Sequence, residues 1–428
     1  MVVNTTDKVS PFGEVLAKQT VVTVIGLGYV GLPLAEAFSN QFKVIGYDKD
    51  NQHVKEINSG NNHNVLATAD PESMKEADFI IIAVPTPVTK TKDPDLSYVI
   101  SASNTVSKYM KPGCTVILES TVYPGVTEEI VKPILENSGK KYGKDFKLAY
   151  CPERINPGDD EQTIEKSVKV VGGMDEETTE SVAQLYSTIC SRVFKAKNIK
   201  TAEAAKVIEN IQRDLNIALF NELCLIFERL GLNTKDVIDA ASTKWNFHRY
   251  SPGMVGGHCI PVDPYYLVCK AKEVGYDARV ILAGRSINDY MPLHIAQMAI
   301  KELNSVGKVI KGSKVLVMGL TYKENVPDTR ETPVKEMIRE LNEYGVELYG
   351  FDPLLGDRVA EFGIKVVNDL KELKSIDSIV LCVGHNVFRK FSLADLAAIM
   401  NHDPVLVDVR GFYDSVEAKN QGFHYRCL

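Results

Sequence analysis

The sequence predicts an α/β protein with two doubly wound domains, each built on a parallel sheet, and a helical connector between them. A weak internal repeat indicates the two domains: Val24-Ile25-Gly26-Leu27 is echoed by Val317-Met318-Gly319-Leu320, and Tyr47-Asp48 by Phe351-Asp352, in the same order about 300 residues later. The repeated strands are near-continuous apolar runs, as is typical of parallel sheets covered on both faces. The connector is indicated by residues 201–230, which contain no glycine or proline.

Composition supports a folded protein of two or three domains and excludes several other classes. The 428 residues are 44% hydrophobic and 25% charged, which is globular usage rather than that of a disordered, collagen-like or coiled-coil chain. A net charge of −7 without a basic run argues against nucleic-acid partners and membrane surfaces. No stretch reaches the ~18 apolar residues of a membrane span, and residues 1–20 lack a signal-peptide core. Eight scattered cysteines without CxxC pairs predict a reducing, cytoplasmic location and no metal site.

The elements along the chain divide it into four predicted segments: an N-terminal tail at 1–20, a first α/β domain at 21–200, a helical central domain at 201–306 and a second α/β domain at 307–428. A helix over 201–230 would be about 45 Å long at 1.5 Å per residue, and Gly231 would end it. A second helical run is expected at 280–306. A helix longer than a linker needs is often a surface for dimerisation, so we expect a homodimer.

A glycine-rich motif follows the first predicted strand. Residues 21–25 are apolar and lead into Gly26-Leu27-Gly28-Tyr29-Val30-Gly31, which precedes a helical run. In this pattern the first glycine makes a tight turn, the second lets the backbone approach a pyrophosphate and the third lets helix and strand pack closely. Asp48 ends the next strand, where a carboxylate binds ribose hydroxyls and repels a 2′-phosphate, although Lys49 blurs that preference. The context predicts a Rossmann-like NAD-binding domain, against the alternative that the glycines serve only helix–strand packing.

The second α/β domain lacks this motif and is expected to bind a different nucleotide. After Gly319 no further glycine precedes the next predicted helix. Lys323 and Arg330 lie in the loop that follows the first strand of this domain, at the edge where open α/β sheets bind ligands. Two cations at this place suit phosphate groups, and the alternative is ordinary solvated surface charge.

Cys259 lies in the most informative stretch, Gly256-Gly257-His258-Cys259-Ile260-Pro261-Val262-Asp263. A cysteine is most often a small buried hydrophobic residue, but here glycines allow a ligand to approach closely and a proline fixes the chain beyond. Asp263 follows four residues later, so a helical turn or a tight loop could bring its carboxylate near the thiol. With a base or a cation nearby, such a cysteine becomes a nucleophilic thiolate.

Side chains for this chemistry are found at three other places. On the predicted long helix, Lys206 and Asn210 are four residues apart and therefore on one face, although such a pair can also be a solvated helix face. Thr121 and Glu153 each follow an apolar strand of the first domain, at the edge that borders the nicotinamide. We therefore expect hydroxyl, carboxylate, ammonium, amide and thiol groups to converge.

Taken together, these motifs resemble those of the nucleotide-sugar 6-dehydrogenases, the UDP-glucose/UDP-mannuronate dehydrogenase superfamily. The resemblance covers residues 21–410 and rests on Gly26-x-Gly28-x-x-Gly31, Val84-Pro85-Thr86-Pro87, Glu119-Ser120-Thr121, Pro152-Glu153-Arg154, Lys206 to Asn210, Gly256-Gly257-His258-Cys259, and Tyr322-Lys323 with Asp328-Thr329-Arg330.

One branch of that superfamily is matched more closely than the others. Lys244-Trp245-Asn246-Phe247 and Asp263-Pro264-Tyr265-Tyr266 are similar to the UDP-N-acetylhexosamine branch, which includes the Vi-antigen and O-antigen enzymes. His258 also resembles this branch, because the UDP-glucose branch usually has another residue there. Ile260-Pro261 departs slightly from the expected Ile-Gly, which leaves the assignment of the cysteine intact.

The resemblance implies that NAD oxidises C6 of a UDP-sugar in two hydride transfers. Cys259 would add to the aldehyde formed first, the second oxidation would convert the thiohemiacetal to a thioester, and water would release the carboxylate. Lys206 and Asn210 would stabilise the oxyanions. Asp263, with a water or Lys206, could take the alcohol proton, and Glu153 could activate the hydrolytic water while Thr121 positions it. The base of the first oxidation stays open among these groups.

The resemblance also implies which residues contact the ligands. For NAD these are Gly26, Gly28, Tyr29, Val30, Gly31, Asp48, Lys49, Pro85, Thr86, Thr121 and Arg330. For the UDP-sugar they are Glu153, Arg154, Ile155, Asn156, Lys206, Asn210, Phe247, Tyr250, Gly256, His258, Tyr322 and Lys323. Residues 247–256 would line the uridine, Lys323 would meet the diphosphate, and the N-acetyl group would lie near Arg154 and His258. A homodimer with the long helix in its interface is implied as well.

Alternatives remain open at this stage. UDP-GlcNAc and UDP-GalNAc differ by one epimeric hydroxyl, and the superfamily also contains UDP-glucose and UDP-ManNAc 6-dehydrogenases. A single-step hydroxyacid or sugar-acid dehydrogenase would need neither Cys259 nor the second α/β domain. A non-catalytic UDP-sugar-binding module would be indicated by the loss of Cys259 or Lys206, and both residues are present.

Overall fold

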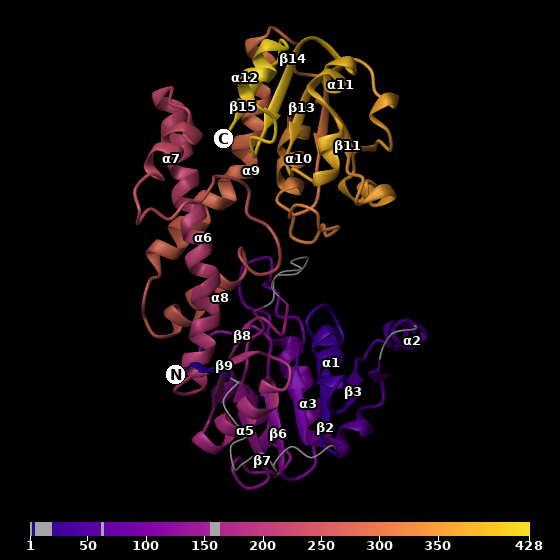
Figure 1. The fold of residues 1–428 in the computed structure, drawn as a ribbon, viewed down its shortest axis with the longest axis vertical. Coiled ribbons are helices and arrows are strands. Elements are labelled where there is room, and N and C mark those ends of the chain that lie inside the picture. Colours follow the sequence, from indigo (N-terminus) through magenta and orange to yellow (C-terminus); the bar gives the residue numbers. More distant parts are fainter. Residues whose placement is uncertain (1, 5–18, 61–63, 155–162) are drawn as a thin grey trace. The chain divides into compact units, whose positions relative to one another are not determined.

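A computed structural model describes residues 2–4, 19–60, 64–154 and 163–428. The chain forms two compact units, each with its own sheet (Figure 1). The first unit contains the described residues up to Asn210 together with Val262–Asp277, and the second contains Ile211–Pro261 with Ala278–Leu428. Both sheets are largely parallel and covered by helices, so the predicted fold class is confirmed. The residues predicted to form a helical central domain are shared between the two units.

The sheet of the first unit has nine strands among the described residues, in the spatial order β1-β9-β8-β7-β6-β5-β2-β3-β4. The strands are β1 (Val2–Asn4), β2 (Val21–Ile25), β3 (Lys43–Tyr47), β4 (Leu66–Thr68), β5 (Phe79–Ile82), β6 (Cys114–Leu118), β7 (Phe146–Tyr150), β8 (Val168–Gly173) and β9 (Arg192–Lys195). The pairs β1–β9 and β7–β8 are antiparallel and the others parallel. Strand order reverses between β2 and β5, which is where doubly wound sheets bind ligands.

Helices cover both faces of this sheet. One face is covered by α1 (Gly31–Ser39), α2 (Asn51–Ser59) and α5 (Glu176–Ser187), and the other by α3 (Ser97–Tyr109), α4 (Lys132–Glu136) and α8 (Asp263–Glu273). The side chains of β5 alternate between the two cores: Phe79 and Ile81 join one, and Ile80 and Ile82 join the other. Because both faces are buried, the strand must be apolar throughout, which explains the continuous runs in the sequence.

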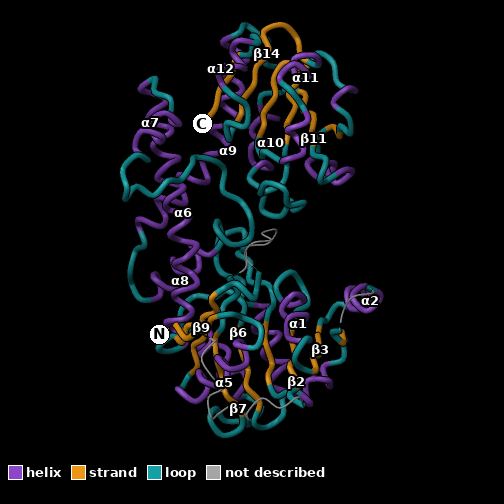
Figure 2. Tube along the Cα trace, in the orientation of Figure 1, coloured by secondary structure: helices purple, strands orange, loops and turns teal. Residues whose placement is uncertain are grey.

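A single helix, α6 (Ile199–Leu230, 32 residues), contributes residues to both units (Figure 2). At 1.5 Å per residue it is about 48 Å long. It begins two residues before the predicted start, because the Asn198 side chain accepts a hydrogen bond from the Thr201 N–H at 2.8 Å and so caps the helix. It ends directly before Gly231, whose φ of +69° suits the residue that follows a helix.

The sheet of the second unit has six strands among the described residues, all parallel, in the order β12-β11-β10-β13-β14-β15. The strands are β10 (Lys314–Met318), β11 (Glu347–Phe351), β12 (Lys365–Val366), β13 (Ile376–Leu381), β14 (Met400–Asp408) and β15 (His424–Cys427). One face packs against α9 (Arg279–Ser305) and α10 (Val334–Glu343), and the other against α11 (Leu393–Ala398) and α12 (Ser415–Asn420). The remaining helix, α7 (Thr234–Ala241), follows α6.

The sequence repeat corresponds to the same local structure in both units. After β2, Gly26 has a φ of +87° and its N–H donates to the Tyr47 carbonyl at 2.9 Å. After β10, Gly319 has a φ of +77° and its N–H donates to the Phe351 carbonyl at 3.1 Å. Each glycine therefore makes the tight turn that leaves the first strand of its domain, in a conformation that other residues rarely adopt.

The repeated aspartates also form equivalent hydrogen bonds, but their surroundings differ. Asp48 accepts from the Leu27 N–H at 2.9 Å, and Asp352 accepts from the Leu320 N–H at 2.7 Å. Asp48 is half-buried, whereas Asp352 is buried and lies 3.2 Å from Nε2 of the buried His385. The second copy of the turn is therefore closed off by a side chain of its own domain.

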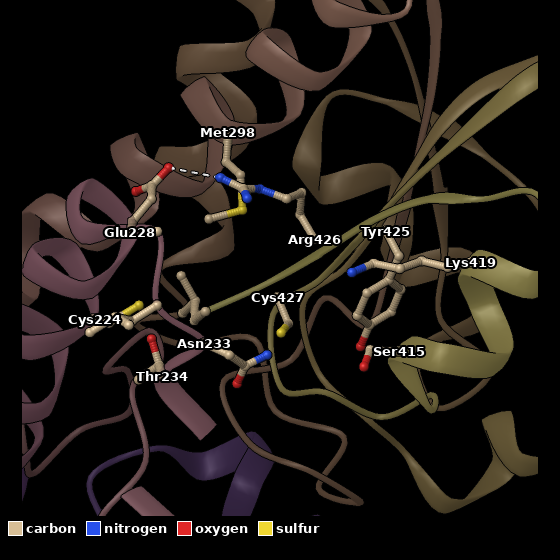
Figure 3. A pocket seen from close by; sticks show the side chains of 13 residues that line it. Cys224, Glu228, Asn233, Thr234, Met298, Ser415, Lys419, Tyr425, Arg426 and Cys427 are labelled. Carbon is tan, nitrogen blue, oxygen red and sulfur yellow. Dashed lines mark hydrogen bonds and ion pairs between the residues drawn. The ribbon is translucent and has the colours of Figure 1, made fainter. Parts of the chain in front are cut away.

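A pocket in the second unit lies between α6, α9, α12 and β15 (Figure 3). Arg426 bridges elements at this place, because its guanidinium contacts Glu228 at 3.2 Å and Glu302 at 3.1 Å. None of the predicted site residues is among those that line the pocket, and we assign no ligand to it. Among the described residues, no helix combines the length and apolar character needed to cross a membrane.

Candidate active site

The glycine-rich turn after β2 leaves space for a ligand next to the backbone. A Cβ atom on Gly26 would lie 2.8 Å from the Ala83 carbonyl oxygen, and one on Gly31 would lie 1.8 Å from the Gly26 carbonyl oxygen, so neither position accepts a side chain. At Gly28 nothing lies within 4 Å of where a Cβ would stand. The backbone at Gly28 is therefore open to a pyrophosphate at the start of α1, and this turn fits NAD.

Asp48 closes this turn from the end of β3. Its Oδ2 accepts from the Leu27 N–H at 2.9 Å, and its Oδ1 accepts from the Asp50 N–H at 3.0 Å. From α2, Nε2 of His53 lies 3.0 Å from the Leu27 carbonyl oxygen, and this hydrogen bond raises the pKa of His53. Sequence reasoning did not identify His53, because nothing in its local pattern distinguishes it from a histidine on a solvated helix.

The other residues predicted beside the glycine turn are on the surface of the first unit. Tyr29 is 45% exposed, and Val30 directly precedes α1. The Lys49 ammonium lies over the Tyr98 ring, 5.3 Å from its centroid. Lys49 therefore has an aromatic partner on α3, which suits a cation that does not need to bind a 2′-phosphate.

The loop after β5, which contains Pro85 and Thr86, is tied to two other elements. The Ser120 hydroxyl donates to the Val84 carbonyl at 2.7 Å, and the Tyr266 hydroxyl of α8 donates to the Thr86 carbonyl at 2.9 Å. Because β2, β5 and β6 are neighbouring parallel strands, their carboxyl ends bring the glycine turn, this loop and residues 119–121 to one edge of the sheet.

Thr121 and Glu153 both lie at this edge, after β6 and β7. Thr121 is half-buried. Oε2 of Glu153 lies 3.2 Å from Nζ of Lys169, a buried lysine on β8 that also bonds to Glu119. Sequence reasoning missed Lys169; the only available signal was a cation within an otherwise apolar strand.

Arg154 is bound to two elements of the first unit. Its guanidinium forms an ion pair with Glu209 of α6 at 2.7 Å and donates to the Val168 carbonyl at 2.8 Å. These contacts fix the arginine next to the predicted sugar site. Ile155 and Asn156, which were also predicted to contact the sugar, lie outside the described residues.

Asn210 of α6 and Asp263 of α8 meet in the first unit. The Asn210 amide donates to Oδ2 of Asp263 at 2.5 Å. Burial raises the pKa of Asp263 to about 6, against the positive charge of Lys206 and the hydrogen bond from Asn210, which both lower it. The ammonium, amide and carboxylate predicted for catalysis therefore do form one group, and an aspartate with this pKa can accept a proton near neutral pH.

Glu203 holds α6 against the segment that follows Thr121. Its carboxylate accepts from the N–H groups of Gly125 and Thr127, at 2.6 and 2.9 Å, and is completely buried. Burial raises the pKa of Glu203 to about 7. Since Glu203 precedes Lys206 by one helical turn, it fixes that part of α6 relative to the cofactor edge. Sequence reasoning missed this residue, because it resembles an ordinary acid near a helix start.

In the second unit, the Gly-Gly-His-Cys loop packs against the loop after β10. A Cβ on Gly256 would lie 2.5 Å from Pro333, and one on Gly257 would lie 2.8 Å from the Tyr322 ring. Gly257 also has a φ of +91°, and its N–H donates to the Glu331 carbonyl at 3.2 Å. Both glycines are therefore required by contact with the second α/β domain, and Tyr322 lies beside Gly257.

His258 and Arg330 meet at one carboxylate. Nε2 of His258 lies 3.4 Å from Asp328, and the Arg330 guanidinium contacts the same carboxylate at 2.8 Å. Burial alone would raise the pKa of Asp328, but hydrogen bonds from Arg330 lower it to about 2. Lys323, in the same loop, is half-buried. Two motifs that lie some seventy residues apart in the sequence thus form one cluster in the second unit.

Phe247 and Tyr250 flank an aromatic residue of α6. Their ring centroids lie 5.9 and 6.0 Å from that of Phe220. Cys259 is exposed, unlike a cysteine that only fills a core. The structure thus groups Lys206, Asn210 and Asp263 in the first unit, and the Gly256–Cys259 loop with the loop after β10 in the second.

Three consecutive regions of the chain match the domains of one protein family. Residues 20–190 match the NAD binding domain of the UDP-glucose/GDP-mannose dehydrogenase family, residues 200–290 match its central domain, and residues 316–415 match its UDP binding domain. The first match contains the glycine turn, the second contains most of α6 and the Cys259 loop, and the third contains the loop with Tyr322 and Arg330.

Curated proteins and solved structures agree with these matches. The chain is 47% identical over 412 residues to protein CapL of Staphylococcus aureus, with 92% of the chain and 97% of that protein covered. It is 42% identical over 414 residues to a UDP-N-acetyl-D-glucosamine 6-dehydrogenase of Pseudomonas aeruginosa, with 93% and 98% covered. The structure of the UDP-D-ManNAc dehydrogenase of Pyrococcus horikoshii superposes with a TM-score of 0.85 at 32% identity, with 96% and 99% covered.

These findings confirm the predicted family, its dehydrogenase activity and NAD as the cofactor. They also support a UDP-sugar as the substrate. The chain therefore belongs to the UDP-glucose/GDP-mannose dehydrogenase family and is an NAD-dependent UDP-sugar dehydrogenase.

Proposed function

We propose that this enzyme oxidises C6 of a UDP-N-acetylhexosamine, UDP-GlcNAc or UDP-GalNAc, to the uronate, for the synthesis of a surface polysaccharide or glycan precursor. The observation that carries the proposal is the 42% identity to a UDP-N-acetyl-D-glucosamine 6-dehydrogenase over 93% of the chain. A second enzyme of that name, from Salmonella typhi, is also 42% identical over 91% of the chain. Identity at this level along almost the whole length supports the same class of sugar.

In the proposed reaction the sugar loses four electrons in two steps, and one NAD molecule accepts the hydride in each step. The C6 alcohol loses a hydride and a proton and becomes an aldehyde. Sγ of Cys259 adds to the aldehyde carbon, and the resulting thiohemiacetal loses a second hydride and a proton to become a thioester. Water adds to the thioester carbon, the C–S bond breaks and the thiol is restored. The exposure of Cys259 supports its role as the nucleophile.

The other proposed catalytic roles follow from the group at α6 and α8 and from the sheet edge. Lys206 and Asn210 would donate to the oxygen that becomes negative when the thiol or water adds. Asp263, held by Asn210 and with a pKa raised to about 6, would take the proton of the alcohol, directly or through water. Glu153 would take the proton of the hydrolytic water, and Thr121 would position that water.

The ligand contacts remain part of the proposal. NAD would bind along the glycine turn, Asp48 and the loop with Thr86, and the UDP part of the substrate would bind the loops around Gly256 and Lys323. The match of residues 316–415 to a UDP binding domain supports the second assignment. We also propose the domain boundaries predicted from the sequence, with a nucleotide domain at 21–200, a central domain at 201–306 and a UDP domain at 307–428.

UDP-ManNAc is a second candidate substrate. The similarity to the UDP-D-ManNAc dehydrogenase structure favours it, because that likeness extends over 96% of the chain. Its sequence identity of 32% is lower than the 42% shared with the UDP-GlcNAc enzymes. Since the epimers differ at one carbon, a contact in the sugar pocket decides between them, and such contacts can change rates by orders of magnitude when a buried polar group is left without its partner.

Substrate and stoichiometry can be measured together. The purified protein would be given NAD with UDP-GlcNAc, UDP-GalNAc, UDP-ManNAc or UDP-glucose, and NADH and uronate would be quantified in the same sample. We expect the highest kcat/KM with UDP-GlcNAc or UDP-GalNAc and two NADH per uronate. A ratio near one would contradict the two-step mechanism, and a clear preference for UDP-ManNAc or UDP-glucose would contradict the proposed sugar class.

We also propose that the enzyme is a homodimer and acts in the cytoplasm. Leu219, Ile226 and Leu230 are 50%, 45% and 64% exposed on α6, at spacings of seven and four residues that form one apolar stripe. A second copy of the same helix would cover such a stripe. Light scattering should give the mass of two chains, and Ile226→Asp should reduce the measured mass to that of one chain. None of the eight cysteines, all of which lie in the described part of the chain, is in a disulfide bond, which supports a reducing compartment.

A further inference from the structure

A buried cluster of charges lies behind Glu153 in the first unit. Lys169 of β8, with only 3% of its side chain exposed, donates to Glu119 at the end of β6. The same ammonium lies 3.2 Å from Oε2 of Glu153 and 4.7 Å from the centroid of the Tyr186 ring. The Tyr186 hydroxyl donates to the second carboxylate oxygen of Glu119. One ammonium thus lies between two carboxylates that come from different strands.

The groups that face this cluster leave few charges in it. Cys151 follows β7 and Cys190 follows α5, and both face the cluster. Burial raises the pKa of both thiols, so they stay neutral. Burial also raises the pKa of the Tyr186 phenol. Glu165 is exposed, and its charge acts on Cys190. Among the described residues, the charges at the centre of this cluster are Lys169, Glu119 and Glu153.

The three charged groups titrate differently. Burial alone would lower the pKa of Lys169, but the carboxylates of Glu119 and then Glu153 outweigh burial and raise it, so the lysine stays protonated. Burial raises the pKa of Glu119 to about 7, although Lys169 opposes this. The lysine is thus a permanent cation, whereas the charge on Glu119 depends on pH in the neutral range.

Only one of the two carboxylates can reach a ligand. The Glu119 side chain has no exposed surface, and its two oxygens bond to Lys169 and Tyr186. The Glu153 side chain is 13% exposed. Burying an ammonium and a carboxylate together rarely adds stability compared with apolar residues of the same size, so an ion pair here needs another reason.

We propose that Lys169 is a positioning residue that orients the Glu153 carboxylate and keeps it ionised, with Glu119 and Tyr186 holding the lysine from behind. The inference rests on the proposed function for the reaction in which Glu153 takes part. There the water that attacks the thioester gives a proton to Glu153 while its oxygen bonds to the carbonyl carbon and the C–S bond breaks. The ammonium keeps its own proton throughout, so it acts only through Glu153.

The inference predicts different effects for two variants that alter the cluster. In Glu119→Gln position 119 is neutral at every pH, as Glu119 itself is well below pH 7, so the lysine still pairs with Glu153 and the acid limb of kcat should stay where it is in the wild type. In Glu119→Gln/Lys169→Met both buried charges are removed together, which avoids leaving one of them without a partner. Glu153 then lacks a cation, and the acid limb should lie roughly one to two pH units above that of the single variant.

Two further measurements separate positioning from a loss of structure. In the double variant hydrolysis of the thioester should slow, so mass spectrometry of acid-quenched enzyme should find more substrate attached to Cys259. KM for NAD should stay unchanged. Lys169→Arg keeps the cation and should keep the acid limb. Lys147→Met is the matched control, because Lys147 is on the neighbouring strand β7 and pairs with Glu177 at the surface, where Glu177 is 81% exposed.

The outcomes distinguish this inference from the proposed function. If the wild-type enzyme oxidises a UDP-sugar but Glu119→Gln and the double variant share one acid limb, the inference is overturned. If the double variant cannot be purified in a folded state, Lys169→Gln takes its place, and an acid limb equal to that of Glu119→Gln overturns the inference. If no UDP-sugar is oxidised, the proposed function fails, and titration of the Glu153 carboxyl by 13C NMR in the same variants, assigned with Glu153→Gln, tests the inference without turnover.

Discussion

At the scale of single residues, Asp48 shows how one carboxylate can serve both fold and ligand. Its two oxygens accept from the backbone N–H groups of Leu27 and Asp50, so the side chain closes the glycine turn before any cofactor binds. A carboxylate has about four acceptor sites, so these two bonds leave sites for the hydroxyls of a ribose. Different substitutions of Asp48 can separate its structural role from its role in binding the ligand.

Asp48→Asn should weaken NAD binding about tenfold and leave UDP-sugar affinity unchanged. The amide oxygen can still accept from the Leu27 N–H, but the charge that strengthens the hydrogen bonds to the ribose is lost. Asp48→Ala should weaken NAD binding further and also lower the unfolding temperature, because the N–H groups of the turn lose their acceptor. Isothermal calorimetry and thermal unfolding measure the two effects, and equal NAD affinity in Asp48→Asn and wild type would contradict the assignment.

Cys259→Ala should abolish uronate formation while both ligands still bind. The thiol is needed for the bond to the sugar and contributes little to ground-state affinity. Because Cys259 is exposed, its loss opens no cavity and the unfolding temperature should stay within a degree or two of wild type. Cys269→Ala on α8 is the matched control and should keep normal turnover. Near-normal uronate formation by Cys259→Ala would remove this residue from the mechanism.

The residues that could be predicted from sequence are those whose role is local. Gly26 is required by the positive φ of its own turn and Gly31 by the nearby Gly26 carbonyl, so their spacing within a strand–turn–helix pattern is sufficient. Lys169 and Glu203 could not be predicted, because each acts through partners on another element. A lysine in a strand and a glutamate in a helix look like solvated residues until the fold brings Glu119, or the N–H groups after Thr121, next to them.

At the scale of elements, α6 is positioned by a buried carboxylate rather than by apolar packing alone. Glu203 accepts two backbone N–H groups from the segment at 125–127, which leads into the helical stretch that begins at Thr127 before α4. A negative side chain at a helix N-terminus is favourable, since the N–H groups there lack partners within the helix. The same contact fixes the register of Lys206 and Asn210 relative to the sheet edge.

Glu203→Ala should lower the free energy of unfolding by about 1–3 kcal/mol, because two buried N–H groups lose their acceptor. It should also reduce kcat, since the turn of α6 that carries Lys206 is no longer fixed. Glu203→Gln keeps one good acceptor and should lie between Ala and wild type in both measurements. Urea unfolding and steady-state kinetics test this, and wild-type stability in the Ala variant would show that the contact is not needed.

The boundaries of the long helix show which parts of an element its sequence pattern predicts. The absence of glycine and proline over 201–230 predicted the body of α6, and Gly231 predicted its end. The start was predicted two residues late, because the cap at Asn198 depends on a side-chain hydrogen bond rather than on helix propensity. The predicted run at 280–306 corresponds in the same way to α9, although that helix contains Pro292.

At the scale of the whole molecule, stability should depend on pH through buried acids with raised pKa values, among them Glu203 and Asp263. Both have pKa values raised by burial, to about 7 and about 6, so the folded protein binds protons that the unfolded chain has already lost. Their contribution to stability is complete below about pH 4, the pKa range of the unfolded carboxyls, and is lost as pH rises through 6 and 7. These two groups therefore make the protein less stable as the solution becomes alkaline.

The free energy of unfolding should fall by roughly 2–5 kcal/mol between pH 5 and pH 8 because of these two groups. Urea unfolding followed by circular dichroism at several pH values gives the slope. In Glu203→Gln/Asp263→Asn the slope should be clearly smaller, because neither position then titrates. A slope equal to that of the wild type in this double variant would show that other groups determine it.

The overall fold could be predicted because its signals are spread along the chain. The repeat, the apolar strands and the uninterrupted helix each extend over many residues, so errors at single positions do not matter. The contacts between residues of the site could not be predicted in this way. His258 and Arg330 were predicted for the sugar and the cofactor, and both contact Asp328, a meeting that depends on how the Gly-Gly-His-Cys loop packs on the loop after β10.

The same turn occurs in both α/β domains, so the two copies can be compared within one chain. Both copies keep the first glycine and the aspartate that accepts from the turn, and this shared part is what the scaffold itself requires. Only the first copy keeps Gly28 and Gly31, and only the second has His385 against its aspartate. Two glycines and one histidine thus distinguish the turn of the NAD binding domain from that of the UDP binding domain. A motif search that scored the aspartate would accept both domains, whereas the glycine spacing alone separates them.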